Sequence, residues 1–436
     1  MAKLKIGVVG SGVSGLSCAW LLSKAHDVTL FEADIRFGGH AHTERFGGVA
    51  VDVGFIVFNE KAYPNLTALF RHLDVATTAT EMGFSVSLDA GRFEYSGGSL
   101  AQLMGSPRAA LSRSHWAMLS DLTRFYRTAK ALAKTLSDDL SLGEFLAQHK
   151  FSKAFTETHL IPMAAAIWSS HPKHMLAYPA KSFIAFFENH QLLELARREP
   201  WQTVSGGSMT YVKKLISAGL KLRGGDAVVR VVRGEEENRV MCASGYSQKF
   251  DHVVLATHAD EALALLDQPT EDERRLLSPF HYSDNEVVVH RDQKLMPKRK
   301  RLWSSWNYVG GATPDKSGVT YWMNSLQKLE TKTQYFVSLN PPVVPDKALT
   351  EMRIQCTHPM FSTETLQAQK GLWSLQGQQN TWFCGAYFGA GFHEDGLQAG
   401  LAVAEHLGGV VRPWSVAGAS DRIFVTEPKF KVMAAE

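Results

Sequence analysis

Short hydrophobic runs and a glycine-rich turn alternate at the start of the chain. Leu4 to Val9 is apolar apart from Lys5 and ends at a turn, which predicts a buried strand. After the turn, the mainly apolar segment 16–22 predicts a helix, and Asp27 to Phe31 predicts a second strand. This order predicts a βαβ unit with a parallel sheet, so we expect an α/β fold that begins with a Rossmann-like domain.

The turn between the first strand and the helix has the spacing G-x-G-x-x-G. In such a unit the first glycine permits the tight turn, the second admits a pyrophosphate, and the third lets helix and strand pack closely. The free N–H groups of the helix N-terminus also attract phosphate. A carboxylate at the end of the second strand is placed to bind a ribose. The pattern predicts a dinucleotide site formed by Gly10, Ser11, Gly12, Val13, Ser14, Gly15, Glu32 and Ala33.

Hydrophobic runs later in the chain predict further elements. Segments 226–232, 250–258, 284–290 and 382–386 are typical of strands, and 397–407 is typical of a helix. Segment 108–134 predicts a basic helix in which Asp121 is the one acidic residue. Its apolar residues suggest that this helix could lie at a membrane interface.

Composition narrows the class of protein. The chain has 436 residues, of which 45% are hydrophobic and 20% charged, which excludes a disordered or collagen-like chain. The net charge of +3 gives no argument for nucleic-acid binding. The four cysteines lie far apart without a CxxC pair, so we predict no metal site and a reducing compartment. Polar residues interrupt the most apolar stretch, 161–187, so we expect a cytoplasmic protein that could be peripheral on the inner face of the membrane.

Residues that follow Glu32 indicate a particular family. Arg36 precedes a glycine pair, Gly38-Gly39, and a strand with the pattern Asp-x-Gly follows at 52–54. In these motifs the chain resembles the flavin-containing amine oxidase superfamily, which includes monoamine oxidases, protoporphyrinogen oxidase and phytoene desaturases. His40 stands where the family usually has arginine, and Ala386 where it usually has aspartate. The resemblance implies noncovalent FAD, with further contacts from Arg36, Gly38, Gly39, His40, Gly54, Phe55, Ile56, Val228, Ala256, Thr257, Gly385, Ala386, Asp395, Gly396 and Leu397.

The resemblance also implies how the chain is divided. A Rossmann-like FAD-binding domain of the amine-oxidase type would consist of residues 1–80, 205–275 and 370–412. An inserted mixed α+β substrate domain would consist of residues 81–204 and 276–369. The C-terminal tail, 413–436, resembles nothing that we can interpret.

Six further segments resemble a bacterial branch of predicted flavoproteins that is associated with lipid modification: 162–170, 186–190, 201–204, 304–308, 321–324 and 391–396. One role in this branch is desaturation of methyl-branched unsaturated acyl chains on the route to furan fatty acids. The resemblance therefore implies an FAD-dependent oxidoreductase that transfers a hydride from a phospholipid acyl chain to the flavin, with oxygen or a quinone as electron acceptor.

Two alternatives remain open at this point. One is a flavin amine oxidase that produces an imine and hydrogen peroxide. Strand 284–290 lacks the lysine that amine oxidases commonly place there, which argues against it. The other is a flavin-bearing, non-catalytic lipid-binding partner of a lipid methyltransferase.

Candidate catalytic and membrane residues follow from the same segments. His393, Glu394 and His190 are candidates for the group that accepts the proton, because histidine or a desolvated carboxylate can act as a base near neutral pH. A basic cluster beside tryptophans fits anionic headgroups. It predicts peripheral membrane contact through Lys298, Arg299, Lys300, Arg301, Trp303 and Trp306.

Overall fold

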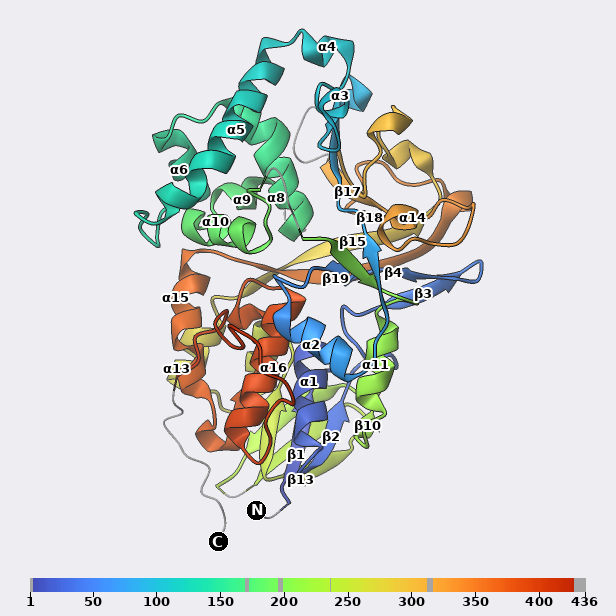
Figure 1. Ribbon diagram of the computed structural model, residues 1–436. Helices are drawn as coiled ribbons and strands as arrows, with labels where there is room; N and C mark the ends of the chain where they lie inside the picture. Colours follow the sequence, from blue (N-terminus) through green and yellow to red (C-terminus); the bar gives the residue numbers. More distant parts are fainter. Residues whose placement is uncertain (1–2, 169–171, 195–198, 236, 312–316, 427–436) are drawn as a thin grey trace.

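A five-stranded parallel sheet forms the lower half of the molecule (Figure 1). The computed structural model describes residues 3–168, 172–194, 199–235, 237–311 and 317–426. The strands predicted at 4–9, 27–31, 250–258 and 382–386 are all in this sheet, which confirms the Rossmann-like prediction. In spatial order the strands are β10 (Lys221–Arg223), β2 (Asp27–Phe31), β1 (Lys5–Val9), β14 (His252–Leu255) and β20 (Thr381–Phe383).

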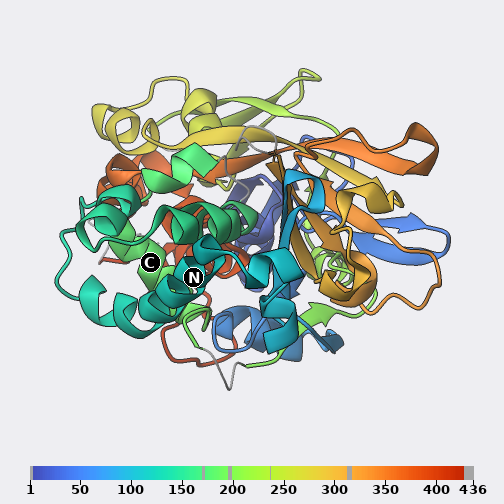
Figure 2. The same ribbon diagram turned by 90° about the horizontal axis from the view of Figure 1, so that it is seen from above.

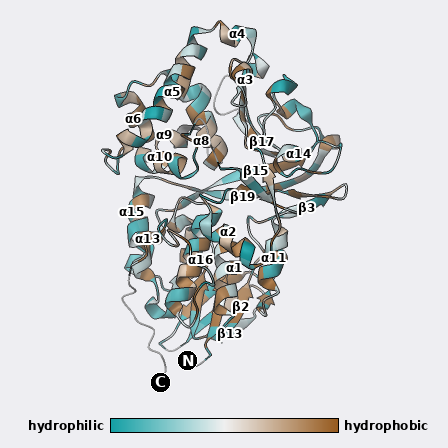
Figure 3. Ribbon diagram, viewed as in Figure 1, coloured by the Kyte–Doolittle hydropathy of each residue, from teal (hydrophilic) through white to brown (hydrophobic). Residues whose placement is uncertain are grey.

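Helix α1 (Val13–Leu22) packs on this sheet, and α16 (His393–Leu407) packs closely against α1. Their approach depends on Gly400, where an added Cβ would lie 2.2 Å from the carbonyl oxygen of Ser14. The helix predicted at 397–407 starts one turn earlier, at His393. Its Gly396 lies close to Val13 at the start of α1. The parallel strands and both helices form one apolar core, visible as the hydrophobic colour in the lower half of Figure 3.

Three small sheets complete the fold, and residues of two of them pack against the seven-stranded sheet described next. One is an antiparallel sheet that contains the strand predicted at 226–232. Another is a hairpin that follows the glycine pair Gly38-Gly39. These sheets consist of β11 (Val228–Arg233), β12 (Asn238–Cys242) and β13 (Ser247–Phe250); β3 (Thr43–Phe46) and β4 (Val49–Asp52); and β5 (Val57–Phe58), β9 (Trp201–Val204) and β6 (Thr77–Thr80).

A seven-stranded mixed sheet and a group of helices form the upper half. The sheet is antiparallel except where β16 pairs with β7. The helices lie beside it, as the view from above shows (Figure 2). In order the strands are β19 (Thr350–Met360), β15 (His281–His290), β18 (Phe336–Leu339), β17 (Ser317–Trp322), β16 (Trp306–Gly310), β7 (Phe84–Leu88) and β8 (Phe93–Ser96).

The basic helix predicted at 108–134 is divided in two. Ser112 interrupts it and caps the second part, because its side chain accepts a hydrogen bond from the backbone N–H of His115. The remaining helices include one π-helical turn at Thr156–Leu160. They are α2 (Pro64–His72), α3 (Leu100–Leu103), α4 (Pro107–Ala110), α5 (Arg113–Ala133), α6 (Leu142–Gln148), α7 (Lys153–Phe155), α8 (Ile161–Trp168), α9 (Pro172–Leu176), α10 (Ala180–Asn189), α11 (Met209–Ile216), α12 (Ala259–Leu265), α13 (Glu271–Leu277), α14 (Met323–Leu326) and α15 (Thr363–Leu372).

The described part of the C-terminal tail, 413–426, packs on the lower half. Trp414 stacks on Trp20 with a centroid distance of 6.0 Å, and Arg422 donates a hydrogen bond to Asp395 in α16. The segment that the sequence left without interpretation thus covers α1 and the start of α16. Residues 427–436 lie outside the described residues.

Candidate active site

A cavity of about 1200 Å³ lies between the carboxyl ends of the parallel strands and the upper half of the molecule. Open α/β sheets bind ligands at this edge. The volume exceeds the range of roughly 300–1000 Å³ that is usual for one small-molecule site. The cavity can therefore hold a dinucleotide and a second molecule together.

Most of the predicted cofactor residues line this cavity. The set is Gly10, Ser11, Gly12, Val13, Ser14, Glu32, Ala33, Gly39, His40, Gly54, Phe55, Ile56, Val228, Ala256, Thr257, Gly385 and Ala386. Six others lie behind the wall: Gly15, Arg36, Gly38, Asp395, Gly396 and Leu397.

The glycine turn fits a phosphate group. Gly10 has a φ of +97°, and a Cβ on Gly15 would lie 1.9 Å from the carbonyl oxygen of Gly10, so both positions require glycine. Gly12, by contrast, has no atom within 4 Å of an added Cβ and faces open space. Because no side chain caps the N-terminus of α1, its first N–H groups are available to an anion.

Glu32 connects the turn to the glycine pair. Its carboxylate accepts hydrogen bonds from the Ser11 backbone N–H at 3.0 Å and from the Ser11 hydroxyl at 2.5 Å. The hydroxyl in turn accepts from the Gly38 N–H at 3.0 Å. Arg36 donates to the carbonyl oxygens of Gly39 and Ala41, so it shapes this loop from behind and does not face the cavity. The fit to a dinucleotide therefore rests on backbone, hydroxyl and carboxylate groups.

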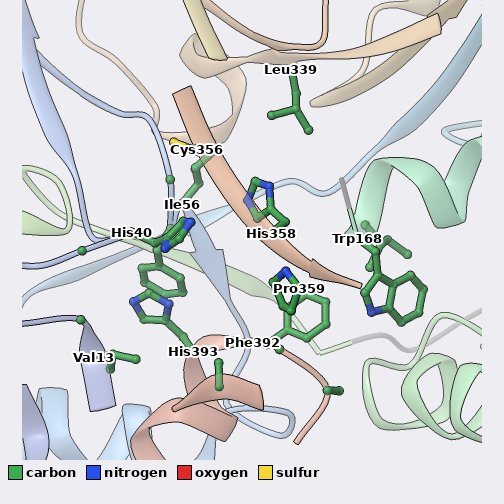
Figure 4. A pocket seen from close by; sticks show the side chains of 18 of the residues that line it. Val13, His40, Ile56, Trp168, Leu339, Cys356, His358, Pro359, Phe392 and His393 are labelled. Atoms are coloured by element: carbon green, nitrogen blue, oxygen red, sulfur yellow. The ribbon is translucent and has the colours of Figure 1, made fainter. Parts of the chain in front are cut away.

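His393 is the first residue of α16 and faces the cavity, as Figure 4 shows. Its ring stacks on Phe55 at 3.9 Å, and its Nε2 shares a 2.8 Å hydrogen bond with the Tyr211 hydroxyl. Burial lowers the pKa of His393 to about 3, and the nearby His40 adds to the effect. His393 is therefore neutral at physiological pH.

His190 also lines the cavity, at the end of α10. Its Nδ1 donates to the Phe186 carbonyl oxygen at 3.0 Å, which leaves the buried Nε2 without a hydrogen-bond partner. Burial lowers its pKa to about 3, and the positive charge of Arg422 acts in the same direction. His190 thus offers an unpaired acceptor inside the cavity.

Glu394 and Asp395 are occupied within the fold. The Glu394 carboxylate accepts hydrogen bonds from the Asn65 amide and from the backbone N–H groups of Asn65 and Leu66 at the start of α2. Asp395 accepts from the Phe392 N–H at 2.8 Å and thereby caps α16. Placed behind the cavity wall, Glu394 is not suited to be a base, which corrects the expectation from the sequence.

Two further histidines, His258 and His358, join His40 in the cavity wall and were not singled out from the sequence. The His40 ring lies 5.3 Å from His358 and 6.4 Å from His258 between ring centroids. The three come from the glycine-pair loop, the residue before α12, and β19. Burial lowers the pKa of His40 to about 4 and that of His358 to about 3, and proximity to the other histidines adds to both effects. Alternation along β19, where Cys356 and His358 both face inward, is the one sequence signal that could have found His358.

The part of the cavity in the upper half, which we call the upper lobe, is apolar. Aromatic and aliphatic side chains of α5, α8, α10 and the seven-stranded sheet form its wall. Among the residues that the structure describes, no Lys or Arg lines the cavity, and the two acidic residues that do, Glu32 and Glu261, belong to the dinucleotide end. The lobe is lined by Tyr95, Leu103, Leu122, Tyr126, His159, Met163, Ile167, Trp168, Phe186, Leu192, Trp201, Trp306 and Tyr321.

The basic cluster predicted to touch a membrane is largely tied into the fold. Arg299 forms an ion pair with the buried Glu94 at 2.6 Å, and Arg301 donates to the Gly105 carbonyl oxygen. Trp303 donates its indole N–H to Pro297, and Trp306 lines the upper lobe. Trp306 therefore faces the cavity, whereas Trp303 is half-buried beside Lys300. Lys298, Lys300 and Arg301 are exposed cations of this segment with no ion pair among the described residues.

The described residues contain neither a membrane-spanning helix nor a metal-binding cluster. No helix in them is long and apolar enough to cross a bilayer. Likewise, the described part of the chain holds no group of three or more His, Cys, Asp or Glu side chains arranged to bind a metal ion.

Comparisons with known proteins agree with this geometry. A sequence model of the family described as flavin containing amine oxidoreductase matches residues 13–323. No curated protein sequence matches the chain significantly.

Three solved structures have a similar fold. A fatty acid isomerase from P. acnes that produces CLA is 16% identical, with a TM-score of 0.64 over 91% of this chain and 97% of that one. Putrescine oxidase bound to putrescine is 14% identical, with a TM-score of 0.67 over 93% and 99%. Cyclohexylamine oxidase from Brevibacterium oxydans is 15% identical, with a TM-score of 0.67 over 93% and 100%. At these identities the likeness concerns the fold.

Proposed function

Because the chain belongs to the flavin-containing amine oxidoreductase family, it is an FAD-dependent oxidoreductase with noncovalent FAD, and we propose that it dehydrogenates a methyl-branched, unsaturated acyl chain of a phospholipid. The observation that carries this proposal is the upper lobe, which is apolar and has no charged side chain among the described residues that line it.

Charge distinguishes an acyl chain from an amine in this lobe. An ammonium group taken from water into an apolar cavity requires a carboxylate partner or must lose its proton. The two acidic residues that line the cavity, Glu32 and Glu261, belong to its dinucleotide end. A neutral hydrocarbon chain needs no carboxylate partner and no loss of a proton, and its burial against aromatic walls is favourable. The fold shared with a fatty acid isomerase supports this choice, although putrescine oxidase shares the fold as well.

We propose that the lower part of the cavity holds the cofactor. Residues 10–14 with the N-terminus of α1 would bind the pyrophosphate, and Glu32 the adenosine ribose. Gly39, Gly54 to Ile56 and Gly385 to Ala386 would surround the ring. The bound flavin supplies the hydride acceptor.

The chain's own residues would position the substrate and hold a proton. The aromatic wall of the upper lobe would exclude water and orient the chain. His393, neutral and fixed between Phe55 and Tyr211, is our candidate for the group that accepts the proton. His190, with its unpaired Nε2, is the alternative.

Substrate reduction of the flavin tests the proposal. The purified yellow protein is mixed without oxygen with detergent-dispersed phosphatidylglycerol that carries a methyl-branched, monounsaturated acyl chain. We expect bleaching of the flavin absorbance and, after aeration, a lipid that has lost two hydrogen atoms. Bleaching by putrescine or another amine, with none by the lipid, would support the amine oxidase and refute the proposal. If neither the lipid nor an amine reduces the flavin, the result would favour the non-catalytic lipid-binding partner.

A lobe-filling variant localises the substrate. Leu122 on α5 lines the upper lobe, whereas Leu119, one turn earlier, does not. Leu122→Trp should raise the KM for the lipid roughly tenfold to a hundredfold, as overpacking by about 1–3 kcal/mol implies, and should leave FAD bound. Leu119→Trp is the matched control with a near-parental KM. Equal KM values for the two variants would place the acyl chain elsewhere.

A further inference from the structure

Helices α3 and α4 and the first turn of α5 form a tip at the top of the molecule in Figure 1. We call residues 99–116 the α3–α5 tip. It presents three large apolar side chains to solvent: Leu100 is 82% exposed, Leu111 86% and Trp116 54%. Singly scattered exposed apolar residues are normal, but a group of them marks a surface that binds something.

The α3–α5 tip is positively charged. Segment 97–120 contains no acidic residue and contributes the exposed Arg108 and Arg113, neither of which pairs with an acid among the described residues. Arg301 is joined to it, because Gln102 donates to the Arg301 carbonyl oxygen at 2.7 Å and the Arg301 side chain donates to Gly105. Lys300, which directly precedes Arg301, is exposed as well. Apolar side chains among unpaired cations match the surface of an anionic bilayer.

The upper lobe approaches the surface at the same place. Gly97 and Gly98 are exposed, line the cavity, and come directly before α3. Leu103 of α3 lines the cavity too, whereas Leu100 at the other end of this helix points to solvent. Both α3 and α4 pack on β8, which carries Tyr95 of the lobe wall. An acyl chain that entered beside α3 would pass directly into the lobe.

We propose that the α3–α5 tip docks on an anionic lipid bilayer and that the acyl chain enters the cavity beside Gly97 and Gly98. This inference rests on the proposed function. Leu100 and Leu111 enter the apolar part of the bilayer, and Arg108 and Arg113 meet the headgroups. A protein partner fits less well, because the opening beside the tip leads into a lobe shaped for a hydrocarbon chain.

Vesicle flotation of the FAD-loaded full chain tests the docking. Vesicles contain phosphatidylcholine with or without phosphatidylglycerol. The parent should float with the anionic vesicles, and less so as salt increases. The double variant Leu100→Gln/Leu111→Gln should bind at least about tenfold more weakly. Arg108→Gln/Arg113→Gln should bind roughly tenfold or more weakly and show a smaller salt dependence.

The matched control is Val343→Gln/Val344→Gln, which changes an exposed apolar pair, 61% and 74% exposed, away from the tip. It should bind vesicles like the parent. If the Leu100/Leu111 variant also binds like the parent, or if the parent binds no vesicles or binds neutral and anionic ones equally, the proposal is wrong.

A second assay separates this proposal from the proposed function. Turnover of lipid in vesicles should fall in the Leu100/Leu111 variant, whereas turnover of the same lipid in detergent should match the parent. An equal fall in both assays would refute docking by the tip. Vesicle binding that depends on the tip, without flavin reduction by any lipid, would retain the docking surface and overturn the proposed function alone.

Discussion

Replacement of His190 by phenylalanine should make the protein less sensitive to acid. His190 is buried among aromatic rings, with Phe186 stacked at 3.9 Å and Phe392 at 5.8 Å, so a phenyl ring fits the site. Burial lowers its pKa to about 3 in the folded protein, against about 6.5 in an unfolded chain. Below pH 6.5 the unfolded chain therefore takes up a proton that the folded protein does not, and stability falls as the pH falls towards 3.

The size of this effect follows from the two pKa values. Between pH 7.5 and 5.0, a group with pKa about 6.5 unfolded and about 3 folded removes about 2 kcal/mol from the free energy of unfolding. His190→Phe abolishes this contribution. It also removes the hydrogen bond from Nδ1 to the Phe186 carbonyl oxygen, together with the unpaired Nε2, so stability at pH 7.5 should change by about 1 kcal/mol or less.

Urea unfolding of the FAD-loaded protein at pH 7.5 and 5.0 measures the difference. The loss of unfolding free energy between the two pH values should be smaller by about 2 kcal/mol in His190→Phe than in the parent. His281→Gln is the control, because this side chain is exposed on β15 and water surrounds it in both states. If His190→Phe and the parent lose the same free energy, His190 is not buried as a neutral group and the reasoning fails.

Three other predictions concern the cofactor and the candidate base. Glu32→Ala should weaken FAD binding to the apo-protein about tenfold to a hundredfold, because a hydrogen bond to a charged group contributes roughly 1.5–3 kcal/mol; unchanged affinity in a flavin titration would place Glu32 outside the site. Gly12→Ala should fold as stably as the parent apo-protein, since its Cβ meets no protein atom within 4 Å, and yet bind FAD more weakly; equal affinity would show that the pyrophosphate does not approach Gly12. For turnover of detergent-dispersed lipid, kcat/KM should vary by no more than about twofold from pH 6 to 8, because the pKa of His393 is about 3; an inflection near pH 6.5 that His393→Gln removes would contradict its burial.

The βαβ unit was predictable because its signals are local. The apolar runs together with Gly10, Gly12 and Gly15 defined the turn, and Gly10 and Gly15 have the conformation and close contacts that the spacing implies. The sequence alone could not decide whether Trp306 lies in the cavity wall or on the surface beside the basic cluster. Only the pairing of β16 with β17 and β7 shows that this side chain lies inside the lobe and not on the surface.

The roles of the acidic residues and histidines depend on partners that are distant in sequence. Glu394 is bound by Asn65 and Leu66, more than three hundred residues earlier. His40 and His358 meet only because β19 crosses above the glycine-pair loop. A single sequence records neither contact, so residue type alone suggested Glu394 as a base and missed His358.

The burial that makes the histidines sensitive to acid also restricts the chemistry of the cavity. At pH 7 His190 and His393 are uncharged, because their pKa values are about 3. Such an imidazole accepts a proton only if negative charge develops near it in the same step. Dehydrogenation of a hydrocarbon would meet this condition, since a hydride accepted by bound FAD would place negative charge in the cavity as the substrate loses its proton. An ammonium substrate would instead bring positive charge before the reaction, into a lobe where the described wall offers no carboxylate. The cavity therefore favours a substrate that is neutral until its C–H bond breaks.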